Sequence, residues 1–189
     1  YSSSKASSDL IVRAWSKTFG LPAIITHSSN NYGPWQFPEK LIPKCIKSAL
    51  SNEPIEIYGD GSNIRDWIHV SDNIEAIIKI LFDGENGEIY NIGSNNELTN
   101  IDLINKICSI LELIKPSPKK NYSELICFVK DRPGHDLRYA VDTSKLRNEL
   151  SWKPKINIEQ GLKSTIKWMI DNSNWINKKS KDLNRMGLR

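Results

Sequence analysis

Residues 23–34 read AIITHSSNNYGP, and this stretch decides the fold class. Its first part, Ala23–His27, is a short, mostly apolar run, which predicts a strand buried on both faces of a parallel sheet. Its second part, Ser28–Pro34, is rich in turn-forming residues, which predicts a loop. Ligands of open α/β sheets bind beyond the carboxyl ends of strands, so Asn30 and Asn31 are candidates for binding a sugar hydroxyl or a carboxamide. An ordinary Asx-rich turn is the alternative.

Helices and strands alternate along the rest of the chain. Apolar residues at helical spacing predict helices over 2–19, 41–50, 72–82, 143–150 and 158–170, and another that begins at Thr99 or Asn100. Strands are expected at 55–58, 88–92 and 125–129, and the polar stretch from Asn172 is expected to fray. This alternation, with short connections, predicts an α/β fold.

The composition is that of an ordinary globular protein, with 189 residues, 39% hydrophobic and 25% charged. The net charge of +4 is mild, and no long basic stripe suggests a nucleic-acid partner. No apolar run approaches the roughly 18 residues that cross a bilayer, and residues 1–5 do not read as a signal peptide. The cysteines, Cys45, Cys108 and Cys127, form neither a zinc pattern nor a disulfide framework. We therefore expect a cytoplasmic protein with no membrane partner and no metal site.

The first residues contain a tyrosine and a lysine at helical spacing. Tyr1 and Lys5 are four residues apart, so they share a helix face. A nearby ammonium favours the phenolate, and a tyrosine activated in this way can take a proton from a sugar hydroxyl. The spacing alone is also expected by chance.

Three further motifs carry charges that suit an anionic ligand. Lys40 lies beside a helix start, where it could contact a phosphate or be a solvated surface group. Arg65 could bind a phosphate with two hydrogen bonds or belong to a surface ion pair. Residues 131–136 read DRPGHD, a rigid turn in which Arg132 could reach a diphosphate or simply be solvated. His69, within an apolar stretch, is expected to be a packed side chain rather than a base.

Taken together and in order, these motifs resemble the nucleotide-sugar 4,6-dehydratases that act on dTDP-glucose, a branch of the extended short-chain dehydrogenase family. The resemblance covers nearly the whole chain and is carried by YSSSKAS at 1–7, SNNYGP at 29–34, FPEKLIP at 37–43, IRDW at 64–67, YNIG at 90–93 and DRPGHD at 131–136. It implies the C-terminal part of a Rossmann-type parallel sheet joined to a smaller α/β substrate-binding domain.

The resemblance also implies a domain arrangement. Residues 1–35 would end the dinucleotide-binding domain, 36–70 would form a segment of the substrate domain, 71–100 would return to the dinucleotide-binding sheet, and 101–189 would complete the substrate domain. Tight binding of NAD, a dTDP-sugar substrate and a homodimer formed through the tyrosine helix are implied as well.

The implied reaction removes hydride from sugar C4, eliminates water across C5 and C6, and returns the hydride to C6. Tyr1 would be the catalytic base, Lys5 would hold the nicotinamide ribose and tune Tyr1, and Asn31 would lie near the nicotinamide. The residues that would bind the sugar nucleotide are Asn30, Glu39, Lys40, Leu41, Glu56, Ile57, Tyr58, Arg65, Asn100, Asp131, Arg132, Pro133, Gly134 and His135.

Two parts of the family pattern are not found in these residues. Gly59-Asp60-Gly61 follows a short strand but lacks the rest of the glycine-rich NAD fingerprint, and the Asp-Glu pair that serves the elimination has no counterpart here. We therefore expect the 189 residues alone neither to bind NAD tightly nor to complete the reaction. A nucleotide-sugar epimerase, a UDP-glucuronate decarboxylase and a non-catalytic sugar-nucleotide-binding module are the alternatives.

Overall fold

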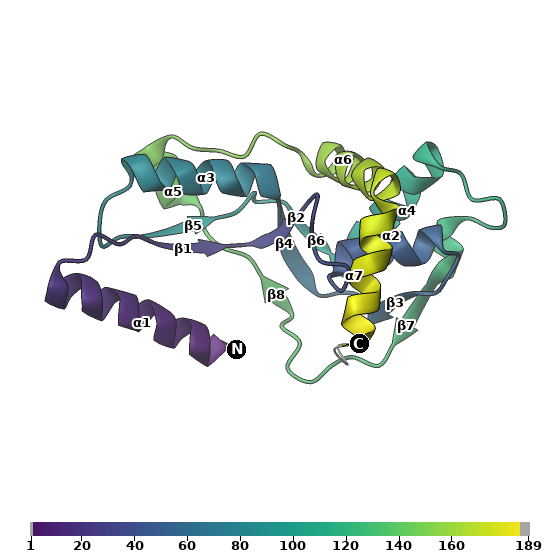
Figure 1. The fold of residues 1–189 in the computed structure, drawn as a ribbon, viewed down its shortest axis with the longest axis horizontal. Helices are drawn as coiled ribbons and strands as arrows, with labels where there is room; N and C mark the ends of the chain where they lie inside the picture. Colours follow the sequence, from purple (N-terminus) through teal and green to yellow (C-terminus); the bar gives the residue numbers. More distant parts are fainter. Residues whose placement is uncertain (1, 186–189) are drawn as a thin grey trace.

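The computed structural model describes residues 2–185, with side chains described up to residue 181. Figure 1 shows an elongated α/β molecule in which α1, β1, β5, α3 and α5 lie towards one end and α2, α4, α6 and α7 towards the other. The helices are α1 Ser2–Phe19, α2 Leu41–Leu50, α3 Val70–Asp83, α4 Asn100–Ile114, α5 Ser144–Leu150, α6 Ile158–Asp171 and α7 Ser173–Arg185, with a 3₁₀ turn at Tyr122–Leu125. The strands are β1 Ile25–Ser28, β2 Asn30–Tyr32, β3 Ile55–Tyr58, β4 Ile64–His69, β5 Ile89–Ile92, β6 Glu97–Thr99, β7 Ile126–Val129 and β8 Arg138–Tyr139.

The strands form small, mostly parallel sheets. β1 pairs with β5 and β3 pairs with β7, both in parallel. β4 pairs in parallel with β2 and β8 and antiparallel with β6. Strand β4 therefore joins the segments around residues 30, 97 and 138, which are far apart in the sequence.

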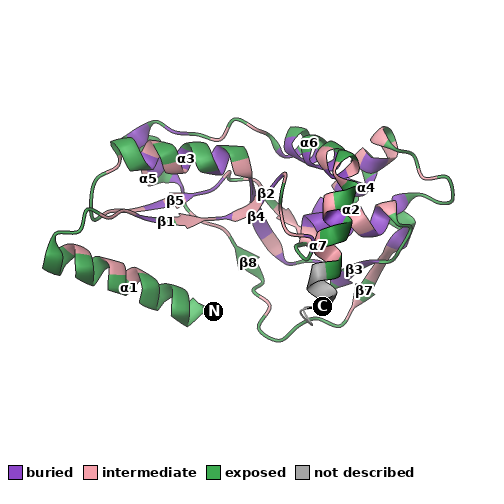
Figure 2. Ribbon diagram, in the orientation of Figure 1, coloured by how far each residue is buried: buried purple, intermediate pink, exposed green. Residues whose placement is uncertain are grey.

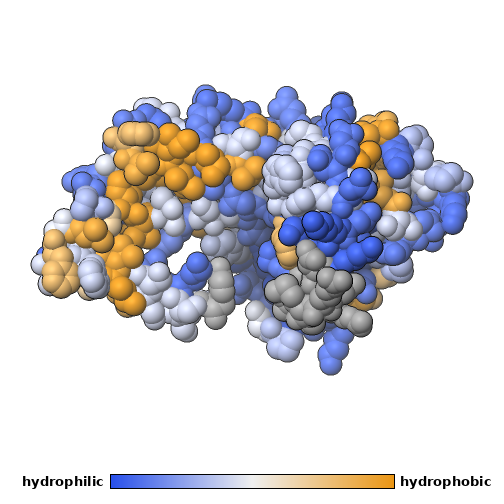
Figure 3. Space-filling view, viewed as in Figure 1, coloured by the Kyte–Doolittle hydropathy of each residue, from blue (hydrophilic) through white to orange (hydrophobic). Residues whose placement is uncertain are grey.

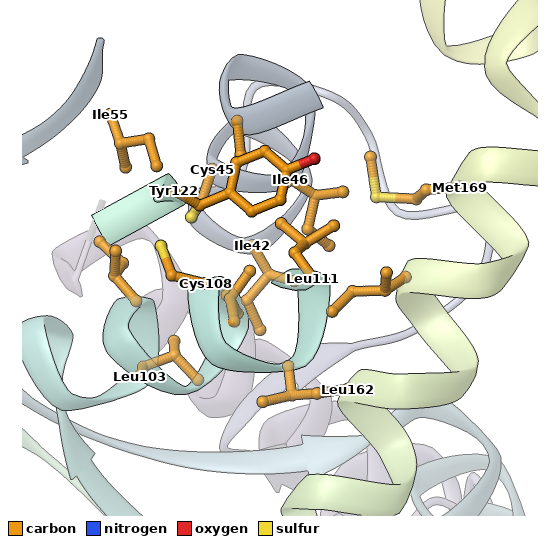
Figure 4. Close-up of a cluster of buried hydrophobic side chains, with 14 of the residues drawn as sticks. Ile42, Cys45, Ile46, Ile55, Leu103, Cys108, Leu111, Tyr122, Leu162 and Met169 are labelled. Atoms are coloured by element: carbon orange, nitrogen blue, oxygen red, sulfur yellow. The ribbon is translucent and has the colours of Figure 1, made fainter. Parts of the chain in front are cut away.

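Two groups of buried side chains hold the molecule together, one at each end (Figure 2). The larger core packs α2, α4 and α6 over β3, and Figure 4 shows Cys45 of α2 and Cys108 of α4 with their sulfur atoms side by side within it. A hydrogen bond with Cys108, together with burial, raises the pKa of the Cys45 thiol. The smaller core joins β5, α3 and α5 through Ile68, Ala76, Ile80, Tyr90, Ile92, Leu146, Leu150 and Trp152.

The α/β class and the helices expected from the sequence are confirmed, but three local expectations are wrong. The expected loop at 28–34 contains strand β2, because its main chain is bonded to β4. The first strand is not buried on both faces, since Ile25 is buried and Thr26 is exposed. The stretch after Asn172 is helix α7, which packs Ile176 into the larger core.

Apolar side chains are exposed on two of the helices. None of the residues described in α1 is buried, and Trp15 and Phe19 of that helix are more than half exposed. Leu81 and Phe82 of α3 are exposed as well, and Figure 3 shows a hydrophobic surface over α3 that continues towards α1. A search of the described residues finds no helix with the length and apolar character needed to span a membrane.

Candidate nucleotide-sugar site

The polar residues predicted from the sequence lie along two paired parallel strands, Asn30 and Asn31 on β2 and Arg65 near the amino end of β4. These parallel strands pair Asn30 with Trp67 and Tyr32 with His69. Ligands in α/β folds bind beyond the carboxyl ends of strands. Asn31 and the turn after it lie at that end of β2, whereas Arg65 is the second residue of β4. The pairing therefore places the Asn30–Asn31 segment two residues along the sheet from Arg65 on the neighbouring strand.

Two side-chain amides in this segment are oriented by main-chain carbonyls. The Asn31 Nδ2 group donates to the Ser29 carbonyl at 3.2 Å, and the Gln36 Nε2 group donates to the Asn31 carbonyl at 2.7 Å. Only the NH₂ end of an amide can donate, so these contacts fix which way each side chain points. Among the described residues, the other ends, Asn31 Oδ1 and Gln36 Oε1, are buried without a hydrogen-bond partner.

The turn between these amides is held by aromatic packing. Gly33 approaches Val70 so closely that a Cβ atom at Gly33 would lie 2.6 Å from a Val70 methyl group. Trp35 adopts the left-handed conformation, with φ of 66°, which is unusual for a bulky residue and costs about 1–3 kcal/mol. Its ring contacts Trp168 and Trp175 at centroid distances of 4.8 and 5.3 Å, each worth about 0.5–1.5 kcal/mol. The two contacts are comparable in size to the strain, so they can hold the turn in place.

A buried arginine defines the second part of the site. Arg65 donates from Nη1 to the carbonyl of Ile64 at 2.7 Å and from Nη2 to the carbonyl of Asp136 at 2.8 Å. Burial lowers the pKa of Arg65, the Asp136 carboxylate opposes this, and the nearby Arg132 guanidinium lowers it further. The buried Arg65 and the nearby, exposed Arg132 place two guanidinium groups in one region, which suits an anion such as a diphosphate. No surface pair with Asp66 forms, because that carboxylate is buried.

Asp66 instead orders the loop after β5. Its two oxygens accept hydrogen bonds from the Ser94 main-chain N–H at 3.0 Å, the Ser94 hydroxyl at 2.9 Å and the Asn96 N–H at 2.7 Å. Gly93 must remain glycine for this arrangement, since a Cβ there would lie 2.4 Å from Asp66 Oδ2. No local pattern signals this role, because the carboxylate and the loop are about 30 residues apart in the chain.

The DRPGHD turn at 131–136 lies against the same site. Asp131 Oδ1 contacts His135 Nδ1 at 2.8 Å, and this hydrogen bond, together with the Arg132 N–H, lowers the pKa of the Asp131 carboxyl. The His135 ring meets the half-exposed Tyr58 ring edge-on at a centroid distance of 6.4 Å. Pro133 and Gly134 are exposed at the tip of the turn. The turn thus meets Tyr58 through His135 and reaches Arg65 through the Asp136 carbonyl and the nearby Arg132 guanidinium.

Asn100 joins these residues from the start of α4. Thr99, rather than Asn100, caps the helix by accepting a hydrogen bond from the Asp102 N–H at 3.1 Å. The Asn100 main-chain N–H donates to the Asn63 carbonyl at 3.0 Å, and the Asn63 side chain in turn donates to the Asp136 carbonyl at 3.2 Å. Within residues 2–185, Asn100 Oδ1 is buried and has no hydrogen-bond partner, so it too presents an unused acceptor.

The other residues predicted to bind the substrate lie in and around helix α2 and strand β3. Glu39 and Lys40 are exposed and pair with each other at 2.8 Å, and Leu41 packs against the larger core. Glu56 pairs with Lys44, also at 2.8 Å. Ile57 is only 1% exposed and lies in the core, so its side chain does not face a ligand and only its main chain can contribute.

The predicted catalytic pair is only partly described. Tyr1 lies outside the described residues. Lys5 is exposed on α1, which is joined to the body by a 2.8 Å contact between Asp9 and His27. The structure therefore links Arg65 with the 131–136 turn but does not test the pairing of Tyr1 with Lys5.

His69 is a packed residue, as the sequence suggested. It is 7% exposed, its Nδ1 accepts a hydrogen bond from the Ser71 N–H at 3.3 Å, and its ring meets Tyr32 edge-on at 5.4 Å. Burial lowers the pKa of His69, opposed by the Asp72 carboxylate, so the neutral ring is favoured. His69 thus caps α3 and supports the end of β2.

The parallel strand pairs and the helices around them define an α/β protein of Rossmann type, with a candidate anion-binding region around Arg65. The family model described as GDP-mannose 4,6 dehydratase matches residues 1–165, and the chain belongs to this family.

Its relatives include dTDP-glucose 4,6-dehydratases. The proteins of that name from Neisseria meningitidis and Haemophilus influenzae are each 52% identical, over 93% and 92% of this chain and 50% and 52% of their own length. The chain thus spans about half the length of these relatives.

Solved structures of two dTDP-glucose 4,6-dehydratases and of an epimerase share the fold of this chain. The dTDP-glucose 4,6-dehydratase of Bacillus anthracis, solved with NAD, is 47% identical with a TM-score of 0.85, over 95% of this chain and 54% of that one. The DesIV enzyme of Streptomyces venezuelae, solved with NAD and TYD, is 40% identical with a TM-score of 0.86, over 95% and 53%. The UDP-glucose 4-epimerase of Thermotoga maritima is 26% identical with a TM-score of 0.80, over 92% and 54%.

Proposed function

We propose that this chain is the C-terminal, substrate-binding part of a dTDP-glucose 4,6-dehydratase, a lyase that forms dTDP-4-keto-6-deoxyglucose and water. The observation that carries the proposal is the identity of 47% and 52% to proteins of that name, against 26% to an epimerase with nearly the same fold. The fold is shared by all of them, so the higher identity favours the dehydratase. Nucleotide-sugar epimerization remains the second candidate.

The arrangement of the site supports binding of a sugar nucleotide. Arg65 and Arg132 provide positive charge for a diphosphate, and Tyr58 provides an aromatic ring that meets His135 of the same turn as Arg132. Asn30 and Asn31 lie on the neighbouring strand β2, opposite Trp67 and Ile68 of β4, and in this proposal they bind the hexose. In this proposal the 131–135 turn and Asn100 cover the nucleotide, and the segment at 39–41 lines the sugar end.

NAD is the proposed cofactor of the intact enzyme. The buried Asn31 Oδ1, for which the described part of the chain supplies no donor, fits the N–H of a carboxamide. Lys5, on the exposed helix α1, is the proposed contact to the ribose and Tyr1 is the proposed base. When bound, NAD supplies reversible hydride transfer at the sugar. No dinucleotide-phosphate loop is recognised in these residues, so we propose that the 189 residues alone do not complete the reaction.

Calorimetric titration with dTDP, UDP and CDP tests the nucleotide assignment. A methyl group in a well-fitted apolar pocket discriminates by about 10- to 200-fold, so dTDP should bind at least tenfold more tightly than UDP. Preference for UDP would refute the thymidine assignment and favour the epimerase or decarboxylase alternatives. The turnover proposal is tested separately with a keto-sugar assay, in which activity of the 189 residues alone would be the contrary result.

We also propose a cytoplasmic homodimer formed through α1. The exposed apolar side chains on that helix, Leu10, Ile11, Trp15 and Phe19, support a contact with a second protein surface. Sedimentation velocity of the wild type and a Trp15→Lys variant tests this, because a charge at the contact should shift the dimer towards monomer.

A further inference from the structure

The side-chain amide of Gln36 donates a hydrogen bond within the protein, but its carbonyl oxygen accepts none from the described residues. Its Nε2 group donates to the Asn31 carbonyl at 2.7 Å, which holds the side chain across the turn that follows β2. Because a carbonyl accepts only from the NH₂ end, the orientation of the amide is fixed by this contact. The Oε1 atom therefore faces the opposite way, and it is buried without a donor from any described residue.

The side-chain amide of Asn31, in the same segment, also donates within the protein while its oxygen accepts no hydrogen bond from the described residues. Its Nδ2 group donates to the Ser29 carbonyl, and its Oδ1 atom is buried with no donor in the described part of the molecule. Buried polar atoms in folded proteins are nearly always hydrogen-bonded, since an unmade bond costs free energy. Two carbonyl oxygens in one short segment therefore indicate that a group outside the protein supplies the missing donors.

The turn that presents Gln36 is held from outside the site. The neighbouring Trp35 packs on Trp168 of α6 and Trp175 of α7, and those two rings also contact each other at 5.6 Å. Helices α6 and α7 lie about 90 or more residues after β2 and β4, the strands that carry Asn31 and Arg65. The position of Gln36 is thus fixed independently of any ligand, as expected of a preorganised binding group.

We infer that Gln36 is a ligand-binding residue whose Oε1 accepts a hydrogen bond from an O–H or N–H group of the bound ligand. The inference rests on the proposed function, which supplies two donors of this kind, the hydroxyls of the hexose and the carboxamide of the dinucleotide. The contact of Nε2 with the Asn31 carbonyl accounts for the donor of the Gln36 amide, and the proposed ligand contact accounts for its acceptor.

The test compares Gln36→Met with Gln160→Met. Methionine keeps the length of glutamine but has no amide, and Gln160 is an exposed residue on α6, so it is a matched control. Calorimetry on each variant and the wild type measures affinity for dTDP, dTDP-glucose, its 2-, 3-, 4- and 6-deoxy forms, and NAD. Thermal unfolding and circular dichroism verify that each variant is folded.

If a sugar hydroxyl is the donor, one deoxy form should bind about tenfold more weakly than dTDP-glucose in the wild type and in Gln160→Met, but equally well in Gln36→Met. If the carboxamide is the donor, the NAD affinity of the intact enzyme should fall about tenfold with Gln36→Met and stay unchanged with Gln160→Met. A role in bracing the turn would weaken all sugar forms by the same factor, which would overturn the inference, as would unchanged affinities. Absence of dTDP binding by the wild type would instead refute the proposed function itself.

Discussion

Replacing Gly161 with alanine tests how the end of the chain positions the site. Gly161 lies in the first turn of α6, and a Cβ atom there would be 2.1 Å from the Tyr32 hydroxyl oxygen and 2.9 Å from Tyr32 Cζ. The Tyr32 ring is 1% exposed and sits at the end of β2, so it has little room to move. The substitution must therefore displace either the helix or the strand that carries the candidate site.

Two effects of opposite sign determine the magnitude. Alanine is favoured over glycine inside a helix by about 1 kcal/mol. Overpacking a buried contact typically costs about 1–3 kcal/mol, and a contact as short as 2.1 Å belongs at the upper end of this range. We expect a net loss of about 1–2 kcal/mol in the free energy of unfolding. For a chain of this size that corresponds to a melting temperature lower by about 2–8 °C.

Urea and thermal unfolding of Gly161→Ala, Tyr32→Phe and the double variant measure this effect. Removing the hydroxyl relieves the shortest contact but leaves the one to Cζ, so the double variant should recover part of the loss. A higher melting temperature for Gly161→Ala would refute the steric argument, because helix propensity would then dominate. Additivity of the two single changes would show that the residues do not meet.

The other predictions concern charged and titratable groups. Arg65→Lys keeps the charge but replaces the planar fork, whose Nη1 and Nη2 reach two separate carbonyls, by a single ammonium group. The dTDP affinity should therefore fall at least tenfold by calorimetry, and an unchanged affinity would exclude Arg65 from the site. Asp72→Ala removes the acceptor for the main-chain N–H groups of residues 155 and 156, at 3.1 and 2.9 Å. The free energy of unfolding in urea should fall by about 2–4 kcal/mol, because two main-chain donors lose their partner. A loss below about 1 kcal/mol would contradict this. Burial lowers the pKa of His69, so the unfolded chain takes up a proton that the folded chain resists, and stability falls as the pH drops below about 6.5. A His69→Gln variant should lose this part of the pH dependence between pH 5 and 8, and an identical slope in both proteins would count against it.

Local patterns in the sequence were sufficient to predict most helices and several residues of the candidate site. Helices such as α2 and α4 bury one face, so apolar residues recur at helical spacing and reveal them. The motifs that contain Asn30, Arg65 and the turn at 131–136 were identified from their residues and order, and the structure places them beside one another.

Tertiary structure alone decided what these residues contact. Strands β2 and β8 are three and two residues long, and they exist because β4 supplies their hydrogen-bond partners from distant parts of the chain. Gln36 and Trp35 could not be recognised in the sequence, because the Asn31 carbonyl and the rings of α6 and α7 give them their roles. The sequence determined which chemical groups are available, since composition and periodicity are local. Which of those groups meet, and which acceptors remain for a ligand, depends on contacts between residues far apart in the chain, and only the folded molecule fixes them.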